Sequence, residues 1–183
     1  MTTTPTVRAS EEADLPAIAA IYAHHVLHGL GTFEEEPPAE AEMAARRAGV
    51  LALGLPYLVA EADEQVVGFA YAAPFRPRTA YRFTAEDSVY IRADHMGRGV
   101  GRRLLTELVA ICESLGLRQL VAVIGDSGNA GSIALHRALG FIETGVGRSV
   151  GYKFGRWVDI VTMQRALNGG DATAPDHAGL RLG

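Results

Sequence analysis

Residues 88–105, SVYIRADHMGRGVGRRLL, decide the fold of this chain. An apolar strand pattern over residues 88–92 leads into a turn containing Gly97, Gly99 and Gly101, and an amphipathic helix pattern follows. Glycines at alternate positions let successive backbone N–H groups converge on one point, because no Cβ atom obstructs the approach. The helix adds its unpaired N–H groups and the positive end of its dipole. We therefore expect the turn to bind an anion, and a diphosphate suits it well.

Three arginines, Arg98, Arg102 and Arg103, place positive charge beside this turn. Two well-known phosphate motifs do not fit it. A Rossmann fingerprint needs a third glycine where Arg102 stands, and a Walker A loop ends in Gly-Lys-Ser/Thr, whereas the only lysine of this chain is Lys153. Because a glycine turn before a helix is structural in many proteins, the remainder of the chain has to identify the ligand.

The bulk composition narrows the class of protein. The chain has 183 residues, of which 48% are hydrophobic and 21% charged, as is typical of one globular domain. The formal net charge is −4 and no basic stripe is visible, which argues against a nucleic-acid partner. There is no signal-peptide pattern and no run of about 20 apolar residues that could cross a bilayer. Cys112 is the only cysteine, so no intrachain disulfide can form, and we expect a cytoplasmic protein without a membrane partner.

Apolar spacing predicts an alternation of strands and helices around one sheet. The expected strands are residues 6–9, 57–62, 66–73, 88–92, 120–124, 141–146 and 159–165, and the expected helices are residues 15–26, 39–53, 100–115 and 130–139. This order indicates a mixed α/β (α+β) fold with hairpins at both ends. From Asn168 the composition turns to Gly, Asp, Ala and Pro, so we expect a domain over residues 1–167 and a flexible tail over residues 168–183.

Two segments resemble the signatures of the GNAT acetyltransferases. In the first, the family has Arg/Gln-x-x-Gly-x-Gly/Ala after a strand; Gly99 and Gly101 match, and Met96 replaces the usual Arg or Gln. Residues 129–141, NAGSIALHRALGF, resemble the second signature, with His136 where the family often has Tyr. The resemblance implies acetyl-CoA as co-substrate, no metal, and a single GNAT-type domain. It also implies a mixed, mostly antiparallel sheet with a splayed central pair of parallel strands, flanked by helices.

A closer resemblance is to the phosphinothricin N-acetyltransferases and their relatives that act on methionine sulfone or methionine sulfoximine. The matching blocks include YLVAE at residues 57–61, EDSVY at residues 86–90, VAVIG at residues 121–125 and KFGRW at residues 153–157. They follow the same order from the first helix to about Leu167, which is more specific than any single motif. The resemblance implies a small amino-acid-like substrate that is acetylated on its amino group, and a homodimer.

Acetyl transfer to an amine needs a base, a site that stabilises the carbonyl oxygen, and a route for the thiolate to leave. Glu86 is the candidate base, because it precedes the strand at residues 88–92 and matches the glutamate that has this role in the phosphinothricin enzymes. Asp87 is the alternative base, and an exposed structural carboxylate is the alternative interpretation of Glu86. His136 is the candidate acid for the thiolate, although a single histidine on a helix is as often simply packed.

The residues expected to bind acetyl-CoA are the strand that supplies free N–H groups, the glycine turn and one asparagine. They are Val89, Tyr90, Ile91, Gly97, Arg98, Gly99, Val100, Gly101, Arg102 and Asn129. For the substrate, a basic loop offers two guanidinium groups for the carboxylate and two rings for the side chain. The residues expected there are Phe75, Arg76, Arg78 and Tyr81, with Phe33 completing the wall.

Other interpretations remain open on the sequence alone. In one interpretation, the acceptor is another small amine or a peptide N-terminus. In another, the chain is a CoA-binding sensor without turnover. A polyamine or aminoglycoside favours an acidic pocket, whereas the loop at residues 75–81 is basic. His24, His25 and His28 put two imidazoles on one helical face, but neither a cysteine nor an HExxH motif accompanies them, so no metal is predicted.

Overall fold

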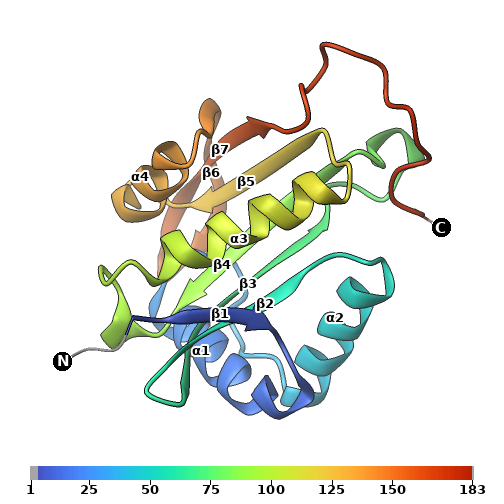
Figure 1. Cartoon of the computed structure of the whole chain (residues 1–183). Helices are drawn as coiled ribbons and strands as arrows, with labels where there is room; N and C mark the ends of the chain where they lie inside the picture. Colours follow the sequence, from blue (N-terminus) through green and yellow to red (C-terminus); the bar gives the residue numbers. More distant parts are fainter. Residues whose placement is uncertain (1–3, 183) are drawn as a thin grey trace.

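The computed structural model describes residues 4–182, and it contains one sheet of seven strands in the order β1-β2-β3-β4-β5-β7-β6 (Figure 1). The strands are β1 (Thr6–Ala9), β2 (Tyr57–Ala62), β3 (Gln65–Pro74), β4 (Thr84–Ile91), β5 (Gln119–Gly125), β6 (Ile142–Lys153) and β7 (Arg156–Ala166). The α-helices are α1 (Leu15–His28), α2 (Glu40–Ala52), α3 (Val100–Ser114) and α4 (Ala130–Ala138). Within the described residues, no helix is long and apolar enough to span a membrane.

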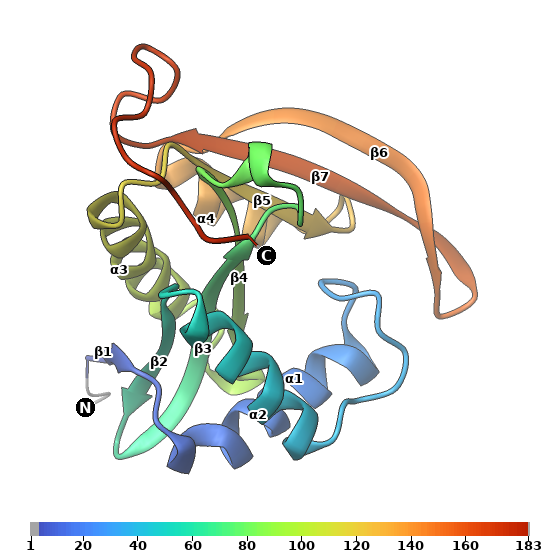
Figure 2. The ribbon, with the colours of Figure 1, turned by 90° about the vertical axis from the view of Figure 1, so that its right-hand side faces the viewer.

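Helices cover both faces of the sheet (Figures 1 and 2). α1 and α2 contact each other and pack on β2, β3 and β4, while α3 packs on the opposite face of the same strands. Ile18 and Val26 from α1 and Leu104 and Leu108 from α3 are completely buried, with Phe69 of β3 between the two layers. The apolar spacing that predicted these helices therefore reflects two hydrophobic layers, one on each face of the sheet.

The central strands β4 and β5 are parallel, and their pairing is short. They pair from Thr84 and Gln119 to Asp87 and Ala122, after which both strands continue without pairing to each other. All other neighbouring strands are antiparallel. The expected mixed sheet with a splayed parallel pair is therefore confirmed.

Three strand boundaries differ by several residues from the sequence prediction. β4 begins at Thr84 and not at residue 88, because the polar residues before Ser88 pair with β3 on one side and β5 on the other. Glu86 therefore lies inside a paired strand. β6 and β7 are both longer than expected and form a hairpin that extends past the rest of the sheet (Figure 2). Glycine and serine interrupt the apolar pattern of β6, and their low strand propensity hid this extension.

The β6–β7 hairpin also holds the segment between α1 and α2. Lys153, at the end of β6, donates hydrogen bonds from Nζ to the carbonyl oxygens of Gly29 at 2.9 Å and Thr32 at 2.8 Å. Phe33 lies against Gly151 so closely that a Cβ there would be 2.4 Å from its ring. A side chain at position 151 would displace the Phe33 ring, and the segment is held at two points.

The C-terminal segment has no helix or strand, but it contacts the body of the protein. Arg118 donates hydrogen bonds to the carbonyl oxygens of Gly170 at 2.7 Å and Thr173 at 2.6 Å. Further along, the N–H of Leu180 donates to the carbonyl oxygen of Arg82 at 2.8 Å. The segment thus runs back to the loop that precedes β4, as Figure 1 shows.

Candidate active site

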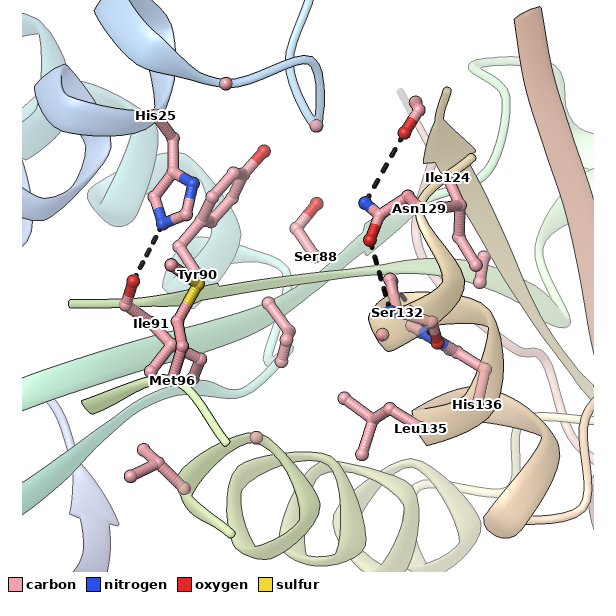
Figure 3. A pocket seen from close by; sticks show the side chains of 18 of the residues that line it. His25, Ser88, Tyr90, Ile91, Met96, Ile124, Asn129, Ser132, Leu135 and His136 are labelled. Carbon is pink, nitrogen blue, oxygen red and sulfur yellow. Dashed lines mark hydrogen bonds between the residues drawn. The ribbon is translucent and has the colours of Figure 1, made fainter. Parts of the chain in front are cut away.

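A cavity of about 560 Å³ opens where β4 and β5 diverge (Figure 3). Its walls come from the ends of α1, β4 and β5, from the glycine turn with the start of α3, and from α4. The residues of the expected acetyl-CoA site that line it are Val89, Tyr90, Ile91, Gly97, Gly99, Val100, Gly101, Arg102 and Asn129. Arg98 is exposed and does not line the cavity.

The glycine turn has the geometry that the sequence predicts. Gly97 and Gly99 have φ angles of 72° and 81°, in the left-handed region that side chains other than glycine rarely adopt. Gly99 precedes α3, and no side chain caps this helix, so its first N–H groups are left for a ligand. A Cβ at Gly101 would lie 3.0 Å from Leu135 of α4, which keeps this position small. These features fit a diphosphate at the helix start.

The free edge of β4 faces the same cavity. The N–H of Arg92 donates to Val67 of β3 at 2.9 Å, so by the alternation of an antiparallel ladder the main-chain groups of Val89 and Ile91 point away from β3, toward β5. The N–H of Tyr90, which the sequence groups with them, points to β3 instead. His25 Nε2 lies 2.8 Å from the carbonyl oxygen of Ile91 and, since that oxygen only accepts, donates to it (Figure 3). The N–H groups of Val89 and Ile91 are the donors available to a thioester carbonyl.

Glu86 lies on β4 with its side chain on the face that α1 and α2 cover. Burial raises the pKa of its carboxyl group, while the charge of Arg76, whose Nη1 is 3.8 Å from Glu86 Oε2, lowers it. The net direction is upward, which moves the carboxylate toward the basicity that a proton acceptor near neutral pH needs. Glu86 itself does not line the cavity, whereas its neighbours Asp87 and Ser88 do.

Asp87 points to the opposite face and forms a buried pair with His136 of α4. Asp87 Oδ2 is 2.9 Å from His136 Nε2, and His136 Nδ1 donates to the carbonyl oxygen of Ser132 at 2.7 Å. Burial lowers the pKa of His136, but Asp87 and the Ser132 carbonyl raise it further, so the net shift is upward. Both ring protons of the imidazolium form are therefore directed at acceptors. Sequence reasoning missed this pair because its members are 49 residues apart.

The expected substrate loop is only partly assembled around Glu86. The guanidinium carbon of Arg76 lies 4.2 Å from the centre of the Phe75 ring, and the rings of Phe75 and Tyr81 meet edge to face at 5.7 Å. Arg78 is exposed, and its side chain makes no hydrogen bond or ion pair with any of residues 4–182. Phe33 contacts the β6–β7 hairpin instead of this loop. The loop thus brings three of the five predicted residues together, and none of the five lines the cavity between β4 and β5.

The remaining candidates have structural partners. Asn129 lines the cavity, but its Oδ1 accepts a hydrogen bond from the N–H of Ser132 at 3.2 Å and so caps α4. The rings of His24 and His28 are 4.9 Å apart at the cavity wall. No group of three or more metal-binding side chains occurs among residues 4–182.

A strand pair splayed over a glycine turn, beside a carboxylate of raised pKa, is the arrangement of an enzyme that transfers an acyl group from a thioester bound along the strand. Residues 19–141 match the model of the acetyltransferase (GNAT) family. Because this match covers more than half of the chain, the protein belongs to the GNAT acetyltransferases, which use acetyl-CoA as the donor.

Individual relatives are similar over nearly the whole chain. The protein is 60% identical to a phosphinothricin N-acetyltransferase of Alcaligenes faecalis over 93% of this chain and 87% of the relative. It is 39% identical to an L-methionine sulfoximine/L-methionine sulfone acetyltransferase of Salmonella typhimurium, over 93% and 98% of the two chains. A crystal structure of a phosphinothricin acetyltransferase from Sinorhizobium meliloti in complex with AcCoA superposes with a TM-score of 0.93, at 48% identity, over 97% and 96% of the two chains.

Proposed function

We propose that the protein transfers the acetyl group of acetyl-CoA to the amino group of a small amino acid of the phosphinothricin, methionine sulfone or methionine sulfoximine type. The observation that carries this proposal is the approach of Arg76 to Glu86, 3.8 Å apart, beside the gap between β4 and β5. A free amino acid presents a carboxylate and an amine on one carbon, so a guanidinium and a proton acceptor side by side match it. The named activities of the relatives agree with this match.

Acetyl-CoA supplies the thioester whose carbonyl carbon the amine attacks and whose thiolate leaves. Glu86 accepts the proton that the ammonium group must lose before attack. The N–H groups of Val89 and Ile91 donate to the carbonyl oxygen as negative charge develops on it. His136, held in its protonated form by Asp87, is the proton source for the departing thiolate, and its Nε2–H has to turn from Asp87 to do so.

The substrate carboxylate binds Arg76 and Arg78, and the rings of Phe75 and Tyr81 form the wall beside it. Leaving a desolvated carboxylate without a cation is strongly unfavourable, so these guanidinium groups select amino acids over simple amines. A polycationic acceptor would meet the same positive charges and be repelled.

The protein acts as a cytoplasmic homodimer in this proposal. The β6–β7 hairpin carries large apolar side chains that are unusually exposed for a monomer, among them Trp157 at 63% and Tyr152 at 59%. A second copy of the chain is the proposed cover for this surface, and Phe33, which lies against the hairpin, would then be near the interface.

Release of free thiol from acetyl-CoA, followed with a panel of acceptors, tests the proposed function. Phosphinothricin, methionine sulfone and methionine sulfoximine should be acetylated with higher kcat/KM than their amides, spermidine or a short peptide. Equal rates with acids and amides would contradict a carboxylate site, and faster acetylation of spermidine would contradict the proposed class of acceptor.

A further inference from the structure

A second cavity, of about 400 Å³, lies between α2 and strands β2 and β3. Its apolar walls include Met43 and Val50 of α2 and Leu53, which directly follows this helix, and its floor includes Tyr57 of β2 and Tyr71 of β3. Nothing in the mechanism above uses this space.

Strand register places this cavity beside the proposed base. Ala73 is the residue of β3 directly opposite Glu86, and it lines the cavity. Residues opposite each other on neighbouring strands share one face, with Cβ atoms about 5 Å apart. The cavity is therefore on the same face as Glu86, one strand away, and an amino acid whose amine is at Glu86 can extend its side chain into it.

One hydroxyl group that opens into this cavity has no partner in the protein. The Tyr57 residue is only 2% exposed, and its hydroxyl makes no hydrogen bond with any of residues 4–182, so what remains accessible of it is directed into the cavity. The hydroxyl of Tyr22, which also lines the cavity, is satisfied by Thr32 at 3.0 Å and Glu34 at 2.8 Å. Burial raises the pKa of Tyr57, so its hydroxyl keeps its proton. A donor is thus held ready for an acceptor atom that the protein does not supply.

The charges around the cavity are already paired with each other. Arg46, at its edge, binds Glu34 at 2.7 Å and also Glu42. The ligand group that Tyr57 receives is therefore an oxygen at the end of an otherwise apolar chain, since Met43, Val50 and Leu53 offer no hydrogen bonds. Sulfone, sulfoximine and phosphinate groups all end an unbranched amino-acid side chain with such an oxygen.

We propose that this cavity is the subsite for the acceptor's side chain, and that the Tyr57 hydroxyl donates a hydrogen bond to the oxygen on its terminal sulfur or phosphorus. The inference rests on the proposed function, because it needs an amino acid whose amine is at Glu86. Tyr57 is then the residue that distinguishes oxygen-ended side chains from hydrocarbon ones of the same length.

Tyr57→Phe, compared on L-methionine sulfone and L-norleucine, tests the hydrogen bond. The variant should lower kcat/KM for the sulfone about three- to tenfold, as expected for one lost hydrogen bond, and leave kcat/KM for norleucine unchanged. KM for acetyl-CoA and the thermal unfolding midpoint serve as checks that the fold is intact. Equal losses on both acceptors, or none on either, would overturn the assignment of Tyr57.

Filling the cavity provides an independent test that does not depend on the hydroxyl. Gly49 lines the cavity and has open space around its would-be Cβ, whereas Ala48, the preceding residue of α2, is exposed and does not line it. Gly49→Leu should lower kcat/KM for methionine sulfone at least tenfold relative to alanine as acceptor, and the matched control Ala48→Leu should not alter this ratio. An unchanged ratio in Gly49→Leu would place the side chain elsewhere. If the parent enzyme acetylates no free amino acid, the proposed function and this subsite fail together; if it does, only the subsite is at risk in the variants.

Discussion

The buried pair of Asp87 and His136 allows a prediction about how the free energy of unfolding changes with pH. The direction of that change should differ between the parent protein and the variant Asp87→Asn. In the folded parent, the pKa of His136 is raised above its ordinary value. A histidine of raised pKa stabilises the fold fully below its unfolded pKa of about 6.5, and this contribution is lost as pH rises through the folded pKa. The pair should therefore make the free energy of unfolding fall as pH rises above about 6.5.

Asp87→Asn should reverse this slope. Without the carboxylate, burial is the largest remaining influence on His136, and burial lowers its pKa. A histidine of lowered pKa destabilises the fold as pH falls, because the unfolded chain then binds the extra proton. The asparagine amide can still donate to a neutral Nε2, so the loss is that of a hydrogen bond to a charged group, about 1.5–3 kcal/mol, greatest at low pH. Cys112 also lies near Asp87, but its pKa of about 12 keeps the thiol neutral throughout.

Urea unfolding of parent and variant between pH 5.5 and pH 8.5 measures this difference directly. Other titrating groups affect both proteins equally, so the difference between the two free energies isolates the pair. The control repeats the comparison in a protein without the imidazole. The free energies of unfolding of His136→Gln and of the double variant His136→Gln/Asp87→Asn should differ by the same amount at every pH. A difference between parent and Asp87→Asn that is independent of pH would refute the view that His136 is protonated by Asp87.

The other predictions concern the two substrates and the assembly. Gly99→Glu should abolish acetyl-CoA binding in calorimetry, while Gly54→Glu, at a glycine with a similarly positive φ of 73°, should retain it. Glu86→Gln should lower kcat about 10²–10⁴-fold. The parent should lose activity as pH falls through the raised pKa of Glu86, and the variant should not. Activity within a few-fold of the parent would exclude this base. Arg78→Ala should lower kcat/KM for amino acids about ten- to a hundredfold but hardly change it for their amides, and equal effects on both would refute carboxylate binding. Light scattering should give a dimer for the parent and a monomer for Trp157→Glu, and a monomeric parent would refute the proposed assembly.

The sequence predicts the conformation of the glycine turn well, because that conformation depends on local residues. A glycine turn between a strand and a helix has few possible geometries, so Gly97, Gly99 and Gly101 could be assigned a shared role from spacing alone. The acceptor half depends on which side chains meet across the sheet. Neither the contact of Asp87 with His136 nor the vacant hydroxyl of Tyr57 follows from local pattern, since both arise from helices packed on strands distant in sequence.

Strand ends were predicted less well than strand centres. The start of β4 was placed too late because Thr84, Glu86 and Asp87 are polar, and polarity normally indicates a loop. These residues form a strand because neighbours on both sides supply main-chain partners. That shift has chemical importance, because a base held in a ladder has less freedom than one in a loop.

The buried position of Lys153 affects how the protein can react as well as how it folds. This side chain is the only lysine in the sequence, it is 1% exposed, and two carbonyl oxygens occupy its ammonium group. Acetyl thioesters modify accessible lysine amines without any catalyst, and an enzyme that holds such a thioester is exposed to this reaction continuously. Here the surface presents arginines, which remain protonated and do not acylate in this way. The protein should therefore accumulate no ε-acetyl groups during turnover, and intact-mass spectrometry after prolonged incubation with acetyl-CoA would detect any that form.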